Sequence, residues 1–253
     1  MAAPWLALIT FGLVFAGALI GALLRLVLPQ HHLEEESRDV LKVVVALTAT
    51  LSAVLFSLLI ASAKNFYDAQ TAEVQVLASK IVLLDRVLAV YGPEASQTRA
   101  DIRTVVVDAV ERIWPSKPTE SSDLQLMRAD GPGMFFSRIA ALTPQTEVQK
   151  VAQAQAIQVA ISLSEIRFLM FTQRINKVPV IFVSVLLFWV VVLFSGYGLL
   201  TRLNGTVLTV LLVSALSVGL AMYLIVEFNH PFDGAIRIPG SIMHDALAQM
   251  GQP

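Results

Sequence analysis

The chain has 253 residues, of which 56% are hydrophobic and only 15% are charged; soluble domains have about half and about a quarter, so this composition indicates a membrane protein. The 18 Lys and Arg residues nearly balance the 19 Asp and Glu residues, and no basic excess suggests a nucleic-acid partner. Cysteine is absent, which excludes disulfides, thiol catalysis and cysteine-ligated metals.

Four apolar stretches are each long enough to cross a bilayer, which takes about 20 helical residues. They cover residues 4–28, 43–63, 178–200 and 206–226. The first has no basic segment before it and exceeds the apolar length of a signal peptide, so we expect a retained helix. The sequence therefore predicts an all-α membrane protein whose four transmembrane helices form two pairs, within residues 1–63 and 178–228.

The first span contains the sequence GALIG, which places Gly17 and Gly21 four residues apart. This GxxxG spacing allows the backbones of two membrane helices to approach closely. We expect these glycines to serve helix packing.

Two stripes of small or hydroxyl-bearing residues run along the second span. On a helix that turns about 100° per residue, one arc consists of Thr48, Ser52, Leu55, Leu59 and Ser62. The roughly opposite arc holds Thr50 and Ser57 among alanines. The first stripe suits a pore lining in which hydroxyls lie near both ends and leucines form a constriction. The pattern alone favours helix packing for both stripes, because small residues and hydroxyls are enriched at membrane helix interfaces.

Residues 64–177 form a polar domain between the helix pairs and hold 13 of the 18 Lys and Arg residues. The positive-inside rule favours a cytoplasmic location for this domain and for both termini, including a tail over 229–253. Neither Gly nor Pro occurs from Gln30 to Tyr91, so the second span can continue into the domain as one helix. Apolar residues recur every three or four positions from Val74 to Tyr91, which predicts a helix packed along one face.

The sequence YGPE at 91–94 predicts the end of this long helix. Gly92 tolerates the left-handed conformation of a helix end, and Pro93 suits the first turn of a following helix. An apolar stripe then predicts that helix over residues 94–113.

We expect mostly loop over residues 114–142, with a short helix at 123–129 and a turn at 130–133. Thr143 and Pro144 predict the N-cap and first position of another long helix. No Gly or Pro follows until the third span begins, so this helix is expected to continue directly into it.

Motifs for enzymatic chemistry are absent from the sequence, including those of phosphate-binding loops, zinc proteases and serine hydrolases. His31 and His32 lie beside three glutamates, and a solvated loop is favoured there over a metal or proton site. The sequence therefore predicts no enzyme, no catalytic residue, no metal and no cofactor.

The fourth span ends in EFNHPFDG, which brings charge and two helix-breaking residues together. Glu227 is expected to anchor the helix end at the bilayer edge. Pro231 and Gly234 should redirect the chain, with Phe232 as an apolar plug and Asp233 in the turn. We interpret these five residues as a structural elbow.

Three stretches resemble the bacterial bestrophin-like membrane proteins of unknown function. They are RDVLKVVVALTATLSAVLFSLLIASAK (38–64), LLDRVLAVYGPEASQTR (83–99) and EFNHPFDGAIRI (227–238). The resemblance implies four spans and a helical cytoplasmic domain, in a layout distantly related to the bestrophins, which are homopentameric anion channels. Because the second span lines the neck of such channels, the resemblance strengthens the pore interpretation of the first stripe.

Two departures limit what the resemblance implies about mechanism. Bestrophins have an aromatic-rich neck, whereas the second span here has only Phe56. The acidic calcium clasp of eukaryotic bestrophins does not map onto Asp233 or onto other acids of this chain. Chloride selectivity and calcium gating therefore do not carry over.

The sequence as a whole favours an oligomeric ion channel in the bacterial inner membrane, with anions preferred and the second span lining the pore. Its expected partners are the lipid bilayer and further copies of itself, as a homopentamer. The alternative is a membrane-anchored helical scaffold that binds other proteins without transporting ions.

Overall fold

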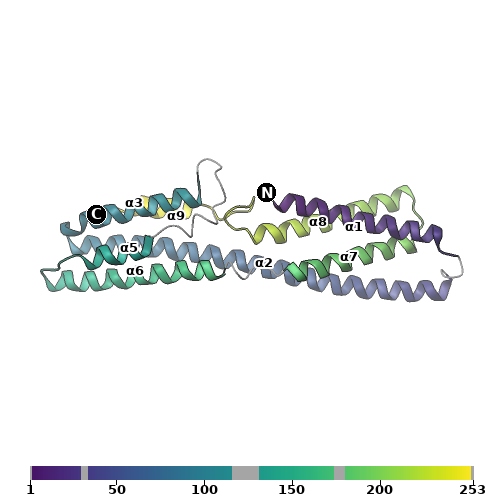
Figure 1. The fold of residues 1–253 in the computed structure, drawn as a ribbon, viewed down its shortest axis with the longest axis horizontal. Helices are drawn as coiled ribbons and strands as arrows, with labels where there is room; N and C mark the ends of the chain where they lie inside the picture. Colours follow the sequence, from purple (N-terminus) through teal and green to yellow (C-terminus); the bar gives the residue numbers. More distant parts are fainter. Residues whose placement is uncertain (1, 30–33, 116–130, 174–179, 252–253) are drawn as a thin grey trace. The chain divides into compact units, whose positions relative to one another are not determined.

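The structure, a computed structural model, describes residues 2–29, 34–115, 131–173 and 180–251 (Figure 1). Every regular element within these ranges is helical, which confirms the predicted all-α class. The elements are α1 (Ala2–Val27), α2 (Glu35–Tyr91), the 3-10 turn η2 (Pro93–Ala95), α3 (Ser96–Ile113), α5 (Gly131–Ala140), α6 (Glu147–Gln173), α7 (Val180–Leu200), α8 (Gly205–Phe228) and α9 (Ser241–Gln249).

The chain divides into two compact units, and α2 contributes to both. The first, here called the membrane unit, comprises residues 1–66 and 177–229. The second, the polar unit, comprises residues 67–176 and 230–253. The tail expected over residues 229–253 thus belongs almost entirely to the polar unit.

The membrane unit contains α1, the first part of α2, α7 and α8, and all four are long and apolar enough to cross a membrane. The bounds of α1, α7 and α8 agree closely with the predicted spans, because the apolar runs end at polar or helix-breaking residues, whereas the second span is one part of the longer α2. For example, Asn204 Oδ1 accepts a 2.8 Å hydrogen bond from Val207 N and so caps the start of α8. The chain is therefore a multi-pass membrane protein.

Helices α1 and α7 cross with their backbones in direct contact at the GxxxG sequence of α1. A methyl group added at Gly17 would lie 3.0 Å from Val191 O, and one added at Gly21 would overlap the Ser195 carbonyl. On the opposite helix, a methyl group at Gly198 would overlap Ala18 O. Each helix therefore needs a glycine at the crossing point, which is the arrangement that the spacing of Gly17 and Gly21 led us to expect.

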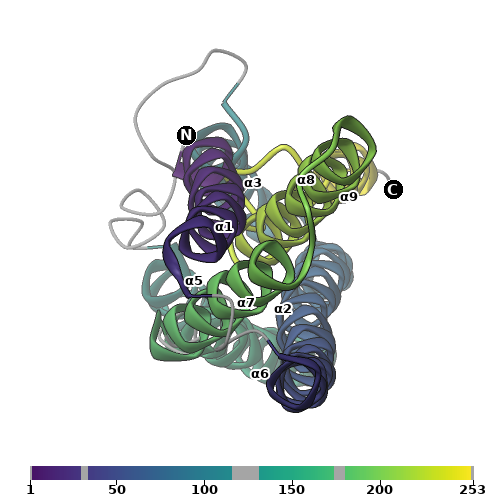
Figure 2. The same cartoon turned by 90° about the vertical axis from the view of Figure 1, so that its right-hand side faces the viewer.

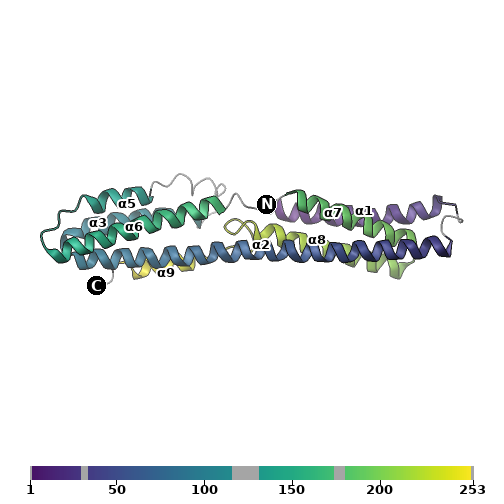
Figure 3. The same cartoon turned by 90° about the horizontal axis from the view of Figure 1, so that it is seen from below.

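The polar unit is a bundle of helices that run alongside one another around a shared apolar core (Figure 3). Much of the predicted apolar seam of α2 faces this core: Leu84 and Leu88 are fully buried, as are Ile102 of α3 and Ile139 of α5. Helix α9 packs against α3. Its buried Met243 and Leu247 explain why the tail joins this unit, since their burial stabilises the bundle.

The YGPE sequence ends α2 as predicted. Gly92 has φ +118°, a conformation that residues with a Cβ rarely adopt, and Pro93 begins the turn η2. The Gln149 side chain of α6 donates a 3.2 Å hydrogen bond to Tyr91 O, so the last turn of α2 is also satisfied from a neighbouring helix.

Helix α5 was not predicted, because residues 131–140 were expected to be turn and loop. Gly and Pro at the start of this segment indicate a turn, but Phe135 and Ile139, one helical turn apart, are both buried in the polar core. Tertiary burial thus outweighs weak local propensity. The short helix expected at 123–129 lies outside the described residues.

Helix α6 begins later than predicted and uses a different cap. The expected N-cap Thr143 lies before the helix, whereas Thr146 Oγ1 accepts a 3.2 Å hydrogen bond from Gln149 N. The Gln149 side chain in turn accepts hydrogen bonds from the backbone N–H groups of Gln145 and Thr146. This reciprocal capping box fixes the start at Glu147. The expected continuation of α6 into the third span lies outside the described residues.

A buried ion pair joins α2, α3 and the end of α9 within the polar unit. Asp85, only 4% exposed, accepts hydrogen bonds of 2.8 Å from both Nε and an Nη atom of Arg99, and one of 2.9 Å from Gly251 N. Arg103 donates to Met250 O at 3.2 Å. Burial raises the pKa of Asp85, but the Arg99 and Gly251 hydrogen bonds and the two arginine charges outweigh it, so the pKa lies below its ordinary value.

The α1–α7 crossing predicts opposite effects for the same substitution at two glycines of α1. Gly21→Ala should destabilise the membrane unit by about 1–3 kcal/mol, because the new methyl group forces the backbones apart. Gly12→Ala is the matched control, since a methyl group there meets no atom within 4 Å, and alanine improves helix propensity by about 1 kcal/mol. Thermal unfolding in detergent measures both; equal stability of the two variants would contradict the proposed crossing.

Removing the Asp85 carboxylate should make the stability of the polar unit less dependent on pH. Because the folded-state pKa lies below the unfolded value of about 4, the ion pair stabilises the fold above that pH and is lost as pH falls through the folded pKa. Asp85→Asn should cost about 3 kcal/mol at neutral pH, and the difference should shrink in acid. Unfolding curves from neutral to acidic pH measure this.

The control for that measurement is Glu147→Gln, which removes the exposed 2.7 Å pair with Lys150. Such a surface pair contributes about 0–1 kcal/mol. A loss of stability equal to that of Asp85→Asn would show that burial is not what makes the Asp85 pair strong.

Candidate functional site

The two stripes of the second span lie on opposite faces of α2 within the membrane unit, one covered by its own chain and one uncovered. Ser52 and Leu59 are buried, at 5% and 4% exposure, and Leu59 belongs to the unit's apolar core. Thr48 and Leu55 are half-buried, and Ser62 is exposed. The stripe expected to line a pore is therefore covered in its middle part by its own chain, because Leu59 and part of Leu55 pack against neighbouring helices.

The opposite stripe is exposed along its whole length. Thr50 and Ser57, which were expected to serve helix packing, are uncovered in the single chain, as are the intervening alanines. The Thr50 hydroxyl donates to Ala46 O at 3.0 Å, which satisfies it without a partner helix. This uncovered stripe, Ala46, Thr50, Ala53, Ser57 and Ala61, is available to water, lipid or another chain.

Helix α2 is also the least covered of the four spans. Only 17% of the most apolar stretch of α2 is buried by its own chain, compared with 33% for α1, 22% for α7 and 28% for α8. The remaining surface of α2 must be covered by something other than its own chain. Together with the small and hydroxyl-bearing stripe, this makes the exposed face of α2 the candidate functional site.

The first part of the predicted elbow closes α8 in the membrane unit. Glu227 is only 5% exposed, and a side-chain hydrogen bond links it to the Tyr223 hydroxyl one turn earlier. Asn229 follows the helix, and its side-chain amide donates a 2.7 Å hydrogen bond to Ile225 O. Glu227 thus lies at the helix end as expected, with its carboxyl group buried.

The second part of the elbow lies in the polar unit. Gly234 N donates to His230 O at 3.1 Å and Ile238 N donates to Pro231 O at 2.8 Å, which folds the segment into a compact turn. Pro231 and Phe232 are buried, Gly234 is half-buried, and Asp233 is exposed. The turn predicted from Pro231 to Gly234 is therefore present.

Trp114 holds this turn, although the sequence indicated only the start of a loop there. Its indole N–H donates a 2.9 Å hydrogen bond to Ile238 O, and its ring meets that of Phe232 edge to face at 6.0 Å. The signal that could have identified it is a large aromatic residue with one polar atom directly after an amphipathic helix.

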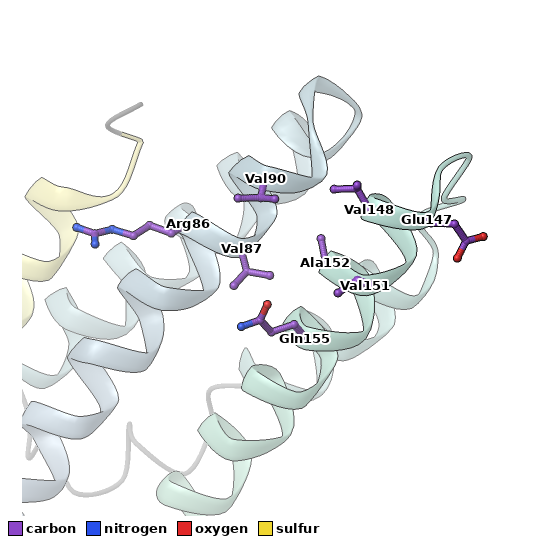
Figure 4. Close-up of a pocket in the computed structure, with 8 residues that line it drawn as sticks. All are labelled: Arg86, Val87, Val90, Glu147, Val148, Val151, Ala152 and Gln155. Atoms are coloured by element: carbon purple, nitrogen blue, oxygen red, sulfur yellow. The ribbon is translucent and has the colours of Figure 1, made fainter.

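A groove of about 430 Å³ lies between α2 and α6 in the polar unit (Figure 4). Val90, Val148 and Val151 line it and are each more than 60% exposed, whereas Arg86 and Glu147 point away at its opposite edges. An exposed apolar groove with charged edges suits an amphipathic helix. The predicted seam of α2 did not reveal the groove, because Val90 lies outside the buried repeat of α2 and the other two valines belong to α6.

The described residues offer no arrangement of at least three His, Asp or Glu side chains that could hold a metal ion. His31 and His32 lie outside the described ranges.

Comparison with known proteins identifies a family. The family model of the Bestrophin-like domain matches residues 12–242, which include all four spans. No curated protein and no solved structure matches the chain.

The Trp114 contact predicts a strong effect of Phe232→Ala on the polar unit. Phe232 is 5% exposed, and removing a buried phenyl ring costs about 3–5 kcal/mol. Phe136→Ala on α5 is the control, because Phe136 is 46% exposed and should change stability by about 0.5 kcal/mol or less. Unfolding midpoints that fall equally in both variants would refute a structural role specific to the turn.

Proposed function

The chain belongs to the bestrophin-like family, and from this premise we propose that it is an oligomeric ion channel in which α2 of each copy lines a shared axis. The observation that supports this most directly is the exposed face of α2. Helix α2 is the least covered of the four spans, and its uncovered stripe carries the hydroxyl groups of Thr50 and Ser57. Assembly of copies around a shared axis would enclose this face and place those hydroxyls along a pathway.

The proposal assigns the pathway to Thr50 and Ser57 instead of the stripe expected from the sequence. To face a pore, Leu59 would have to leave the apolar core and Ser52 its buried position, and burying a leucine is worth about 1.5–3 kcal/mol relative to exposing it. Thr50 and Ser57 need no such rearrangement. Small side chains between them allow close approach of neighbouring copies.

Further features of the proposal come from the family resemblance and the charge distribution. We infer anions as the preferred ions and a homopentamer as the assembly, because bestrophins have both properties. We infer a bacterial inner membrane from the resemblance to bacterial proteins, and we place the polar unit in the cytoplasm because residues 64–177 carry most of the Lys and Arg. The proposed activity is transport without catalysis or a bound cofactor.

A membrane-anchored interaction protein is the second candidate. The observation in its favour is the apolar groove between α2 and α6, whose exposed valines would bind an amphipathic helix of another protein. In that case Val151→Glu should abolish partner binding, and the membrane unit should carry no current.

Because the chain contains no cysteine, single cysteines can test which face of α2 meets the ions. We expect Thr50→Cys and Ser57→Cys channels in planar bilayers to lose most of their current when a charged, water-soluble thiol reagent is added. The reagent reacts fastest with a thiol in water and adds charge to a narrow pathway.

Ser52→Cys and Leu59→Cys are the matched controls on the same helix, and the cysteine-free wild type controls for non-specific effects. Both control variants should keep their current. If the reagent blocks the current at Ser52→Cys and Leu59→Cys but not at Thr50→Cys or Ser57→Cys, the pathway runs along the stripe that contains Ser52 and Leu59. Absence of any unitary current would favour the interaction protein.

A further inference from the structure

Three arginines gather at one end of the membrane unit. Arg25 lies in the last turn of α1, Arg38 lies near the start of α2, and Arg202 lies in the connection between α7 and α8. Figures 1 and 3 show that these helix ends belong to the same end of the unit, and Figure 2 looks onto it. Arg38 and Arg202 both lie within electrostatic range of Arg25, so like charges meet at this end of the unit.

Two of these guanidinium groups have buried nitrogens without a hydrogen-bond partner among the described residues. They are one Nη atom of Arg25 and Nε of Arg38, each shielded from solvent although its residue is only half-buried. A buried polar group without a partner costs about 1–3 kcal/mol, and more if it is charged. The cluster therefore combines like-charge repulsion with unsatisfied donors.

Among the residues that the structure describes, no acidic side chain forms an ion pair with these arginines. Asp39 forms an exposed 2.8 Å pair with Lys42, and Glu34, Glu35 and Glu36 are exposed. The negative end of the α1 dipole favours Arg25 in its last turn, but the positive end of the α2 dipole disfavours Arg38. The helix dipoles therefore explain why a positive charge is stable at Arg25 but not why one lies at Arg38.

We propose that Arg25, Arg38 and Arg202 form a binding site for a phosphate group. Phosphate offers several charged acceptor oxygens, and guanidinium groups donate to such oxygens in a planar fork. The site lies where spans begin and end, so a phosphate could come from the headgroup of an anionic lipid or from free inorganic phosphate. The proposal does not rest on ion conduction, because none of the three residues lies on the exposed stripe of α2.

The test uses the full chain in lipid discs and distinguishes the two sources. Thermal unfolding is measured in phosphatidylcholine discs, in discs that also contain phosphatidylglycerol, and in phosphatidylcholine discs with inorganic phosphate titrated against chloride at equal ionic strength. Stabilisation by phosphatidylglycerol alone assigns the site to a lipid headgroup. Stabilisation by inorganic phosphate in neutral discs assigns it to the free ion.

Arg25→Gln and Arg38→Gln should weaken the stabilising ligand by about tenfold to a hundredfold, the effect of losing one charge-assisted hydrogen bond. Lys42→Gln, one turn after Arg38 and already paired with Asp39, should bind as tightly as the wild type. Arg202→Gln, in an exposed connection, provides the same test if a helix variant does not fold. No stabilisation of the wild type by either ligand, or equal stabilisation of the arginine and Lys42 variants, would overturn the proposal.

Discussion

The length and continuity of α2 determine most of what this chain can do. The helix runs for 57 residues without Gly or Pro and supplies apolar side chains to the cores of both units. Within the membrane unit only one of its faces is covered, while Thr50, Ser57 and their alanine neighbours are left uncovered. A membrane helix with so little contact inside its own chain must contact lipid or other copies of the chain. The proposed channel requires contact with other copies.

Local sequence signals predicted those parts of the fold that depend on them. Apolar length located the four spans, and the GxxxG spacing located the backbone contact at Gly17 and Gly21. The YGPE sequence located the end of α2, because a φ of +118° requires glycine. Prediction failed where tertiary contacts decide: α5 forms because Phe135 and Ile139 are buried, and Thr146 caps α6 because Gln149 completes a capping box.

The same distinction explains the candidate site. A helical wheel correctly separated two faces of α2, but it could not say which face the rest of the chain would cover. Ser52 and Leu59 are buried by neighbouring helices distant in sequence, which no pattern within the span records. The arginine cluster could not be predicted from the sequence either, since its members come from three separate segments and meet only after folding. The channel proposal thus rests on a helix face that the folded chain leaves uncovered, and the phosphate-site proposal rests on guanidinium nitrogens that it leaves without hydrogen-bond partners.

The central claim is that the exposed face of α2 is covered by further copies of the same chain. The mass of the purified protein in lipid discs, after subtraction of lipid and scaffold, tests it most directly. The proposed shared axis predicts one uniform assembly of several 27.5 kDa chains, five if the family resemblance holds for stoichiometry. A single 27.5 kDa chain that remains folded in the bilayer would contradict it.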